Sequence, residues 1–356
     1  MGSYTIIGLM SGTSMDGLDL AHVRFTLCEN DRWEFTVNQT ETYKYPKRVL
    51  EKLQNVIKFS PQELLHLDKE LGLLFSDRIN AFIALNNIDK ELVDAIASHG
   101  HTVFHQPENG FSHQIGCGET MSLRTGIPVI NDFRQKDIAA GGQGAPLVPV
   151  GDKLLFSDLA EAFLNIGGIS NICFPGELTA AFDVCPGNLP MNRIANNLGL
   201  EYDAEGLIAK SGSVDSVVLE QLNNLKFYNA SPPKSLGVEW LIEHLYPIID
   251  SIQEEKIALR TYVEHIAIQI AKELNSVNKK SVMITGGGAF NAFLIERIQS
   301  NYLGNIILPD AQLINFKEAI VFGFLGALYL SGRPNTLSTV TGAKYDTMGG
   351  VLHTPF

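Results

Sequence analysis

The spacing of hydrophobic residues along this 356-residue chain predicts alternating strands and helices. Apolar positions recur every three or four residues over residues 61–86 and 257–274, as they do in an amphipathic helix with one buried face. Short apolar runs bounded by breakers predict buried strands at residues 93–98 and 126–131, and residues 318–330 read as a further helix. This alternation is typical of an α/β protein.

Two segments share one design, a strand, a turn rich in glycine and serine, and a second strand. The first occupies residues 4–25 and the second residues 163–174. A third glycine cluster, Gly286, Gly287 and Gly288, follows a strand predicted at 281–285 and precedes a helix predicted at 291–299. Two hairpins of the same design predict two similar domains.

The order of these segments resembles the hexokinase and actin superfamily, in which ATP lies in a cleft between two duplicated ribonuclease H-like α/β domains. The length agrees, because 356 residues exceed what one hydrophobic core usually holds. We expect an N-terminal domain of residues 1–131 plus about 318–356, with the first hairpin and the sugar contacts. A second domain, about 132–317, would carry the second hairpin, a catalytic aspartate and the nucleoside loop.

Both hairpin turns suit the binding of phosphate. In the first, Gly8, Gly12 and Gly17 would let backbone amides approach an anion, and Asp16 and Asp19 could hold the Mg²⁺ that accompanies a nucleotide. The spacing fits neither the Walker A motif nor the dinucleotide fingerprint, and one such loop alone could be an ordinary tight hairpin. The second loop favours ATP binding. The residues expected to bind ATP are Gly12, Thr13, Ser14, Met15, Asp16, Gly17, Leu18, Asp19, Gly167, Gly168, Gly286, Gly287 and Gly288.

Composition narrows the class of protein. The formal net charge of −12 makes a nucleic acid partner unexpected. The first residues lack the basic and apolar regions of a secretion signal, and the apolar stretch 319–330 is shorter than a membrane span. The four cysteines form no CxxC pair, so we expect reduced thiols in a cytoplasmic protein without a membrane partner. They are Cys28, Cys117, Cys173 and Cys185.

Several long motifs resemble the anhydro-N-acetylmuramic acid kinase family, and they run over nearly the whole chain. They are Gly8–Asp19, Ser98–His105, Asp132–Leu147, Asn165–Asn171, Pro186–Asn188, Gly286–Gly288 and Ser338–Gly342. The resemblance implies a cytoplasmic, usually dimeric enzyme of bacterial cell-wall recycling and amino sugar catabolism. Such an enzyme uses ATP and water to open a 1,6-anhydro ring and to phosphorylate O6, giving N-acetylmuramic acid 6-phosphate.

The chain departs from the family pattern in the residues that follow Asp183 and at His101. The family usually has Asp-Thr-Gly-Pro-Gly-Asn where this chain has Asp183-Val-Cys-Pro-Gly-Asn188, and Gln where it has His101. We expect Val184 and Cys185 to alter the sugar pocket. This leaves the preferred anhydro sugar open but not the phosphoryl transfer.

Asp183 is the expected catalytic residue. A 1,6-anhydro sugar has no free O6 hydroxyl, so a base must activate water for attack on the anomeric carbon. The resemblance gives this role to Asp183, which we place on the turn after the second hairpin. The alternative is that Asp183 caps a helix beginning near Pro186.

The expected sugar-binding residues are His99, Thr102, Arg134 and Glu318. Glu318 matches an acidic family residue, but it could equally be a first-turn acid favoured by a helix dipole. Arg134 would reach the sugar or phosphate, or else pair with Asp137. The residues His99, His101 and His105 invite a metal-site interpretation, but a complete hairpin precedes them, which favours a place at the sugar for His99 and His101.

These features favour a homodimeric kinase for a small anhydro sugar. A levoglucosan-type or other anhydro sugar kinase is the alternative in the same class. An actin-like ATP-binding switch is the alternative in another class, and the retention of Asp183 argues against it, because a switch needs no base near an acceptor.

Overall fold

The computed structural model describes residues 2–12 and 15–356, and the chain divides into two compact units. Unit 1 contains residues 1–156 and 316–356, and unit 2 contains residues 157–315. The first boundary therefore follows Phe156, later than the position near residue 131 that the sequence led us to expect. The reason is packing within unit 1, because the ring centre of Phe156 lies 5.4 Å from that of Phe35.

A mixed β-sheet forms the centre of unit 1. β1, β2 and β3 are antiparallel, β4 runs parallel to β1, β6 runs parallel to β4, and the sheet order is β12-β6-β4-β1-β2-β3 with β5 paired to β4. The strands are β1 (Gly2–Ser11), β2 (Leu18–Leu27), β3 (Trp33–Tyr43), β4 (Ala95–Gln106), β5 (Phe111–Ile115), β6 (Val129–Asn131) and β12 (Val351–His353).

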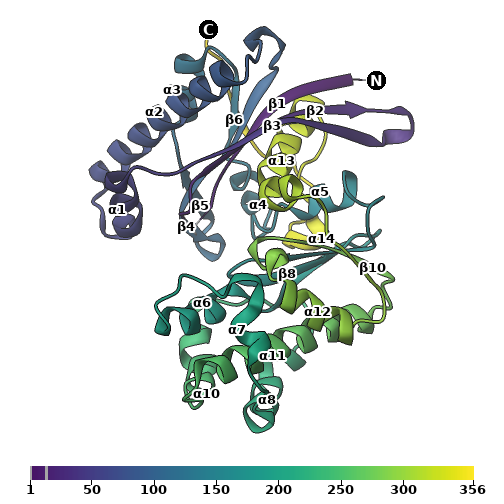
Figure 1. The fold of residues 1–356 in the computed structure, drawn as a ribbon. Coiled ribbons are helices and arrows are strands. Elements are labelled where there is room, and N and C mark those ends of the chain that lie inside the picture. The colour runs from purple at the N-terminus through teal and green to yellow at the C-terminus, as the bar shows by residue number, and fades with distance from the viewer. Residues whose placement is uncertain (1, 13–14) are drawn as a thin grey trace. The chain divides into compact units, whose positions relative to one another are not determined.

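Helices cover this sheet (Figure 1). The long helix α2 starts with a capping box in which Ser60 and Glu63 satisfy each other's backbone amides, and its Leu71 and Phe75 pack against Ile7 of β1 in one buried cluster. The helices of this unit are α1 (Lys47–Asn55), α2 (Pro61–Leu85), α3 (Gly118–Thr125), α4 (Gln135–Ala139), α5 (Pro149–Leu154), most of α13 (Ala311–Leu330) and α14 (Ser338–Thr341).

Helix α13 is the core helix of unit 1. By length and composition it could cross a membrane, but 67% of its most apolar window is buried in the structure, as in the core helix of a globular protein. Gly8 of β1 lets the helix approach, since a Cβ there would lie 2.0 Å from the carbonyl oxygen of Ala319. Helix packing therefore accounts for this glycine, and its expected role in approaching an anion stays a prediction.

Unit 2 repeats the strand order of unit 1. Its sheet order is β11-β10-β7-β8-β9, in which β7, β8 and β9 are antiparallel and β10 runs parallel to β7. This matches β6-β4-β1-β2-β3 strand for strand, and it confirms the predicted duplication of an α/β domain. The strands are β7 (Ala162–Ile166), β8 (Ile169–Phe174), β9 (Ala180–Pro186), β10 (Ser281–Thr285) and β11 (Asn305–Ile307).

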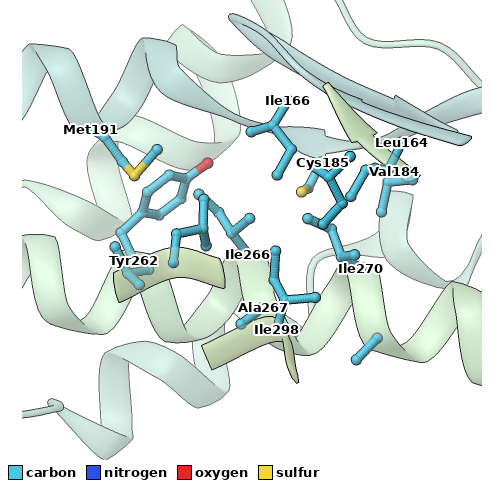
Figure 2. Close-up of a cluster of buried hydrophobic side chains, with 14 of the residues drawn as sticks. Leu164, Ile166, Val184, Cys185, Met191, Tyr262, Ile266, Ala267, Ile270 and Ile298 are labelled. Carbon is cyan, nitrogen blue, oxygen red and sulfur yellow. The ribbon is translucent and has the colours of Figure 1, made fainter. Parts of the chain in front are cut away.

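The core of unit 2 lies between its sheet and helix α11. Figure 2 shows Val184 and Cys185 of β9 directed toward Ile266 and Ile270 of α11. Val184 is 1% exposed and Cys185 is fully buried, so their side chains pack in this core and do not line a pocket. An effect on the sugar pocket through this packing stays a prediction. The helices are α6 (Asn188–Asn197), α7 (Leu207–Ser211), α8 (Ser216–Asn223), α9 (Val238–Trp240), α10 (Tyr246–Ile249), α11 (Glu255–Ser276) and α12 (Ala292–Asn301).

Candidate active site

The turn between β1 and β2 carries the first set of expected ATP-binding residues. Met15 donates its backbone N–H to the carbonyl of Gly12 at 3.1 Å and has a φ of 61°, which closes the turn tightly. Leu18 is different, because its side chain is 1% exposed and packs in the core of unit 1. Thr13 and Ser14 lie outside the described residues.

Asp19 and Asp16 offer two carboxylates beside this turn. Asp19 lies on β2, where its Oδ1 accepts a hydrogen bond from Thr42 at 2.6 Å. Burial raises the pKa of Asp19, the Thr42 hydrogen bond opposes this shift, and the charge of Asp16 adds to it. A cation beside these carboxylates would relieve that repulsion, and oxygen ligands suit Mg²⁺, so the residues fit the ion.

No group of three or more His, Cys, Asp or Glu side chains suited to a metal occurs among the residues that the structure describes. An Mg²⁺ ion held by Asp16 and Asp19 would thus need further oxygen ligands from water or phosphate, which is how proteins commonly hold Mg²⁺ beside a nucleotide.

A buried chain of hydrogen bonds fixes the start of the turn. Tyr45 donates its hydroxyl to Ser11 Oγ at 2.6 Å, and Ser11 Oγ lies 2.9 Å from Nδ1 of His101. With Ser11 accepting from Tyr45, its own proton can be donated to the unprotonated Nδ1 of a neutral His101. Burial lowers the pKa of His101, which favours this neutral form. His101 is 1% exposed, so it holds the end of β1 and does not line a sugar pocket.

The structure brings three of the expected sugar-binding residues together in one pocket of unit 1. The pocket has a volume of about 210 Å³ and includes His99, Thr102 and Arg134. It also contains Gly12 of the phosphate turn. Its full lining is Met10, Gly12, His99, Thr102, His105, Arg134 and Ala145.

Arg134 is held in place by His99. Its guanidinium donates to Nε2 of His99 at 2.7 Å and to the carbonyl of Gly144 at 2.8 Å. Nδ1 of His99 lies 2.9 Å from the carbonyl of Gly100, so His99 must be neutral with its proton on Nδ1. Burial, and next the charge of Arg134, place the pKa of His99 well below its usual value. His99 therefore orients the guanidinium.

Arg134 and Asp137 do not form the ion pair that was the alternative for Arg134. Asp137 instead accepts from the Gly144 amide and from the hydroxyl of Thr341, both at 2.8 Å. Burial lowers the pKa of Arg134 to about 10, while Glu318 opposes the shift. Arg134 remains a cation at neutral pH.

Glu318 lies beyond the first turn of its helix, because α13 begins at Ala311. The alternative explanation as a first-turn acid is therefore wrong. Burial raises the pKa of Glu318, Lys317 and Arg134 lower it, and Asp19 adds to the rise. Glu318 thus shares one electrostatic neighbourhood with the expected sugar residue Arg134 and the expected Mg²⁺ ligand Asp19.

In unit 2 the second glycine turn is tied to the segment after β9. The amides of Gly187 and Asn188 donate to the carbonyls of Gly168 and Gly167 at 2.9 and 2.8 Å. Both turn carbonyls are therefore paired. An added Cβ at the partly exposed Gly167 would make only ordinary contacts, at 3.4 and 3.6 Å, so this position does not require glycine for space within the protein.

The third glycine cluster lies against the same turn. Gly286 has a φ of 80°, and a Cβ there would lie 2.6 Å from the side-chain oxygen of Asn165. A Cβ on Gly288 would lie 2.2 Å from Cγ2 of Ile166, so only glycine permits this approach. The structure therefore brings two of the expected ATP-binding segments of unit 2 together.

Asp183 lies on strand β9 and not on a turn as expected. Its Oδ2 accepts a hydrogen bond from the Leu236 amide at 2.9 Å, which leaves Oδ1 as its second acceptor. Helix α6 has Gly187 at its N-cap and no side-chain cap there, so the capping alternative is wrong. Burial raises the pKa of Asp183 and the Leu236 hydrogen bond opposes this rise. A half-buried carboxylate with a raised pKa suits a general base.

Sequence reasoning missed the residues that support Asp183. Lys234 and Leu236 form hydrogen bonds with Asp183 through their backbone groups, and Glu273 binds the side chain of Lys234. Lys234 and Leu236 stand in a Lys-Ser-Leu-Gly segment that resembles a family motif. The resemblance to that motif could have identified the segment from the sequence. It could not have predicted the contact of the segment with β9.

Comparison with known proteins identifies the family. A family model described as anhydro-N-acetylmuramic acid kinase matches residues 4–355. The chain is 35% identical over 364 residues to the anhydro-N-acetylmuramic acid kinase of Sulfurovum sp. (strain NBC37-1), with 99% of each chain covered. It is 37% identical over 372 residues to that of Shewanella loihica (strain ATCC BAA-1088 / PV-4), again with 99% of each covered.

Among solved structures the likeness is more distant. The activator of 2-hydroxyisocaproyl-CoA dehydratase from Clostridium difficile with bound ADPNP gives a TM-score of 0.43 at 14% identity, with 92% of this chain and 97% of that chain covered. A ROK family glucokinase from Streptomyces griseus in complex with glucose and AMPPNP gives 0.38 at 12%, with 91% and 99% covered. The full-length sequence matches carry the assignment: this chain belongs to the anhydro-N-acetylmuramic acid kinase family of phosphotransferase enzymes.

Proposed function

We propose that the protein uses ATP and water to open the 1,6-anhydro ring of anhydro-N-acetylmuramic acid and to phosphorylate O6. The product is N-acetylmuramic acid 6-phosphate, within cell-wall recycling. The family match over residues 4–355 supports the reaction class. The observation that carries the mechanism is Asp183, whose Oδ2 is held by the Leu236 amide while Oδ1 is left to accept a proton.

The chemistry requires two bonds to change together. Water attacks the anomeric carbon and gives its proton to Asp183, while the bond from that carbon to O6 breaks. O6 takes the γ-phosphoryl group as the bond from phosphorus to the ADP oxygen breaks. Burial raises the pKa of Asp183 and so strengthens it as a base, while the Leu236 hydrogen bond opposes this rise and favours the ionised carboxylate.

The glycine turns would hold the ATP phosphates through backbone amides, and the segment Gly286–Gly288 would accommodate the nucleoside. Asp19 and Asp16 would hold Mg²⁺, which neutralises charge on the phosphates when bound. The pairing of these two carboxylates beside the first turn supports this role.

On the sugar side, Arg134 would bind an anionic or hydroxyl group in the pocket that it shares with Thr102. His99 orients Arg134 by accepting a hydrogen bond from its guanidinium, and the Glu318 carboxyl supplies an acceptor near Arg134. The enzyme would act as a cytoplasmic homodimer, as the family resemblance implies, on a small-molecule sugar.

The proposed substrate is tested by measuring ADP release with a panel of sugars. We expect ADP release to require anhydro-N-acetylmuramic acid, with little release when ATP is supplied alone or with reducing N-acetylmuramic acid. Greater activity with levoglucosan would favour the simpler anhydro sugar kinase. Sugar-independent ATP turnover would instead favour an ATP-binding switch.

A further inference from the structure

The loop of residues 231–237 pairs with β9 at Asp183. The Asp183 amide donates to the carbonyl of Lys234 at 3.1 Å, and the Leu236 amide donates back to Oδ2 of Asp183 at 2.9 Å. The loop therefore supplies both a partner for the Asp183 backbone and the hydrogen bond that orients its carboxylate. Whatever fixes the loop also fixes the carboxylate.

The side chain of Lys234 anchors this loop to the body of unit 2. Its Nζ donates to Oε1 of Glu273 on α11 at 2.8 Å, and the side chains are only 5% and 18% exposed. The same Nζ lies 5.5 Å from the ring centre of Phe182 and 5.1 Å from that of Phe227. Two aromatic faces and one carboxylate therefore hold the ammonium group.

Titratable groups in the neighbourhood of Asp183 include Lys234, Glu273, Cys185 and, through Cys185, Tyr228. Cys185 is fully buried on β9, and burial raises its pKa to about 12, which keeps it a neutral thiol. Its pKa is also influenced by Lys234, Asp183 and Glu273, so all four groups lie in one neighbourhood. Lys234 is the cation of this set.

We infer that Lys234 is a positioning residue for the general base: by binding Glu273 between the rings of Phe182 and Phe227, it holds the Leu236 amide on Asp183. This inference rests on the proposed function and deepens it, since it assigns a role to a residue that acts through the Leu236 amide. The hydrogen bond from Leu236 favours the ionised carboxylate, so losing the anchor should both misplace the base and raise its pKa.

The test is the Lys234→Met variant, which keeps a long apolar stem in the aromatic cage and removes the charge. We expect kcat to fall by about tenfold or more, because small displacements of a base are costly, with KM for ATP changed by less than about twofold. The acidic limb of the kcat–pH profile should move to higher pH, because a base with a raised pKa must be deprotonated at higher pH to act. Lys234→Arg should restore part of the rate.

A matched control lies in the same unit. Lys210 binds Glu296 at 2.9 Å and lies 5.7 Å from the ring centre of Phe293, but both charged side chains are about half exposed. Lys210→Met should leave kcat and the pH profile unchanged. Glu273→Gln keeps the aromatic cage and the shape of the Glu273 side chain. It should move the acidic limb in the same direction as Lys234→Met, and it replaces Lys234→Met as the test if that variant does not fold.

A folded Lys234→Met or Glu273→Gln enzyme with normal kcat and an unmoved acidic limb would overturn the inference. The two levels of failure are distinguishable. If Asp183→Asn is inactive while the Lys234 and Glu273 variants are normal, only the positioning role fails. If Asp183→Asn is itself active, the proposed base is wrong.

Discussion

The Asp183→Asn enzyme should fold and bind ATP normally but lose at least about 100-fold in turnover, because a general base typically contributes about 100- to 10,000-fold. Asparagine keeps the shape of the side chain and retains an oxygen that can accept from the Leu236 amide, as Oδ2 does at 2.9 Å. The loop contact with β9 is therefore preserved. Only the capacity to take a proton from water is removed.

The measurement is single-turnover product formation alongside calorimetric ATP binding and thermal unfolding. An unchanged ATP affinity and melting temperature would show that the loss is confined to the chemical step. Near-normal turnover in the variant would remove Asp183 from the mechanism.

Replacing Gly167 with valine should weaken ATP binding by about 10- to 100-fold, the loss expected when about one or two charge-assisted hydrogen bonds to phosphate are prevented. Within the protein an added Cβ at Gly167 meets Asn165 Nδ2 at 3.4 Å and the Ile169 carbonyl at 3.6 Å, which are ordinary contacts. The Cβ therefore fits in the folded protein, and because Gly167 is partly exposed, the branched side chain would occupy the space beside the turn. That space is where we place the phosphates.

The matched control is Gly176→Val in the same unit, where an added Cβ meets nothing within 4 Å. Calorimetric titration with ATP should separate the two variants, while their melting temperatures stay close to that of the unmodified protein. A folded Gly167→Val protein with unchanged ATP affinity would show that the second hairpin turn does not hold the phosphates.

Much of the fold could be predicted from local patterns. The helix expected over residues 61–86 is α2 (Pro61–Leu85), and the two hairpins are β1–β2 and β7–β8, because apolar periodicity and glycine turns are local signals. The strand expected at 93–98 runs from Ala95 to Gln106, because its second half forms a hairpin with β5, the next strand along the chain. The histidines and Gly100 in this half of the strand interrupt the apolar run from which a buried strand is predicted.

The site residues divide in the same way. His99, Thr102 and Arg134 were expected together and do line one pocket. His101 supports Ser11 in a buried hydrogen-bond chain that also includes Tyr45. Tyr45 lies between β3 and α1, and no spacing rule in the sequence identifies this contact. The inward direction of Val184 likewise depends on where α11 packs.

The most direct test of the account is a single turnover in ¹⁸O-labelled water with ATP and anhydro-N-acetylmuramic acid. The sugar must be trapped at once by reduction, because the product hemiacetal exchanges its C1 oxygen with solvent. If Asp183 activates water for attack on the anomeric carbon, the label should appear at C1 of the sugar and not in the transferred phosphate. Label in the phosphate, or an unlabelled sugar product, would contradict the proposed coupling of ring opening to phosphoryl transfer.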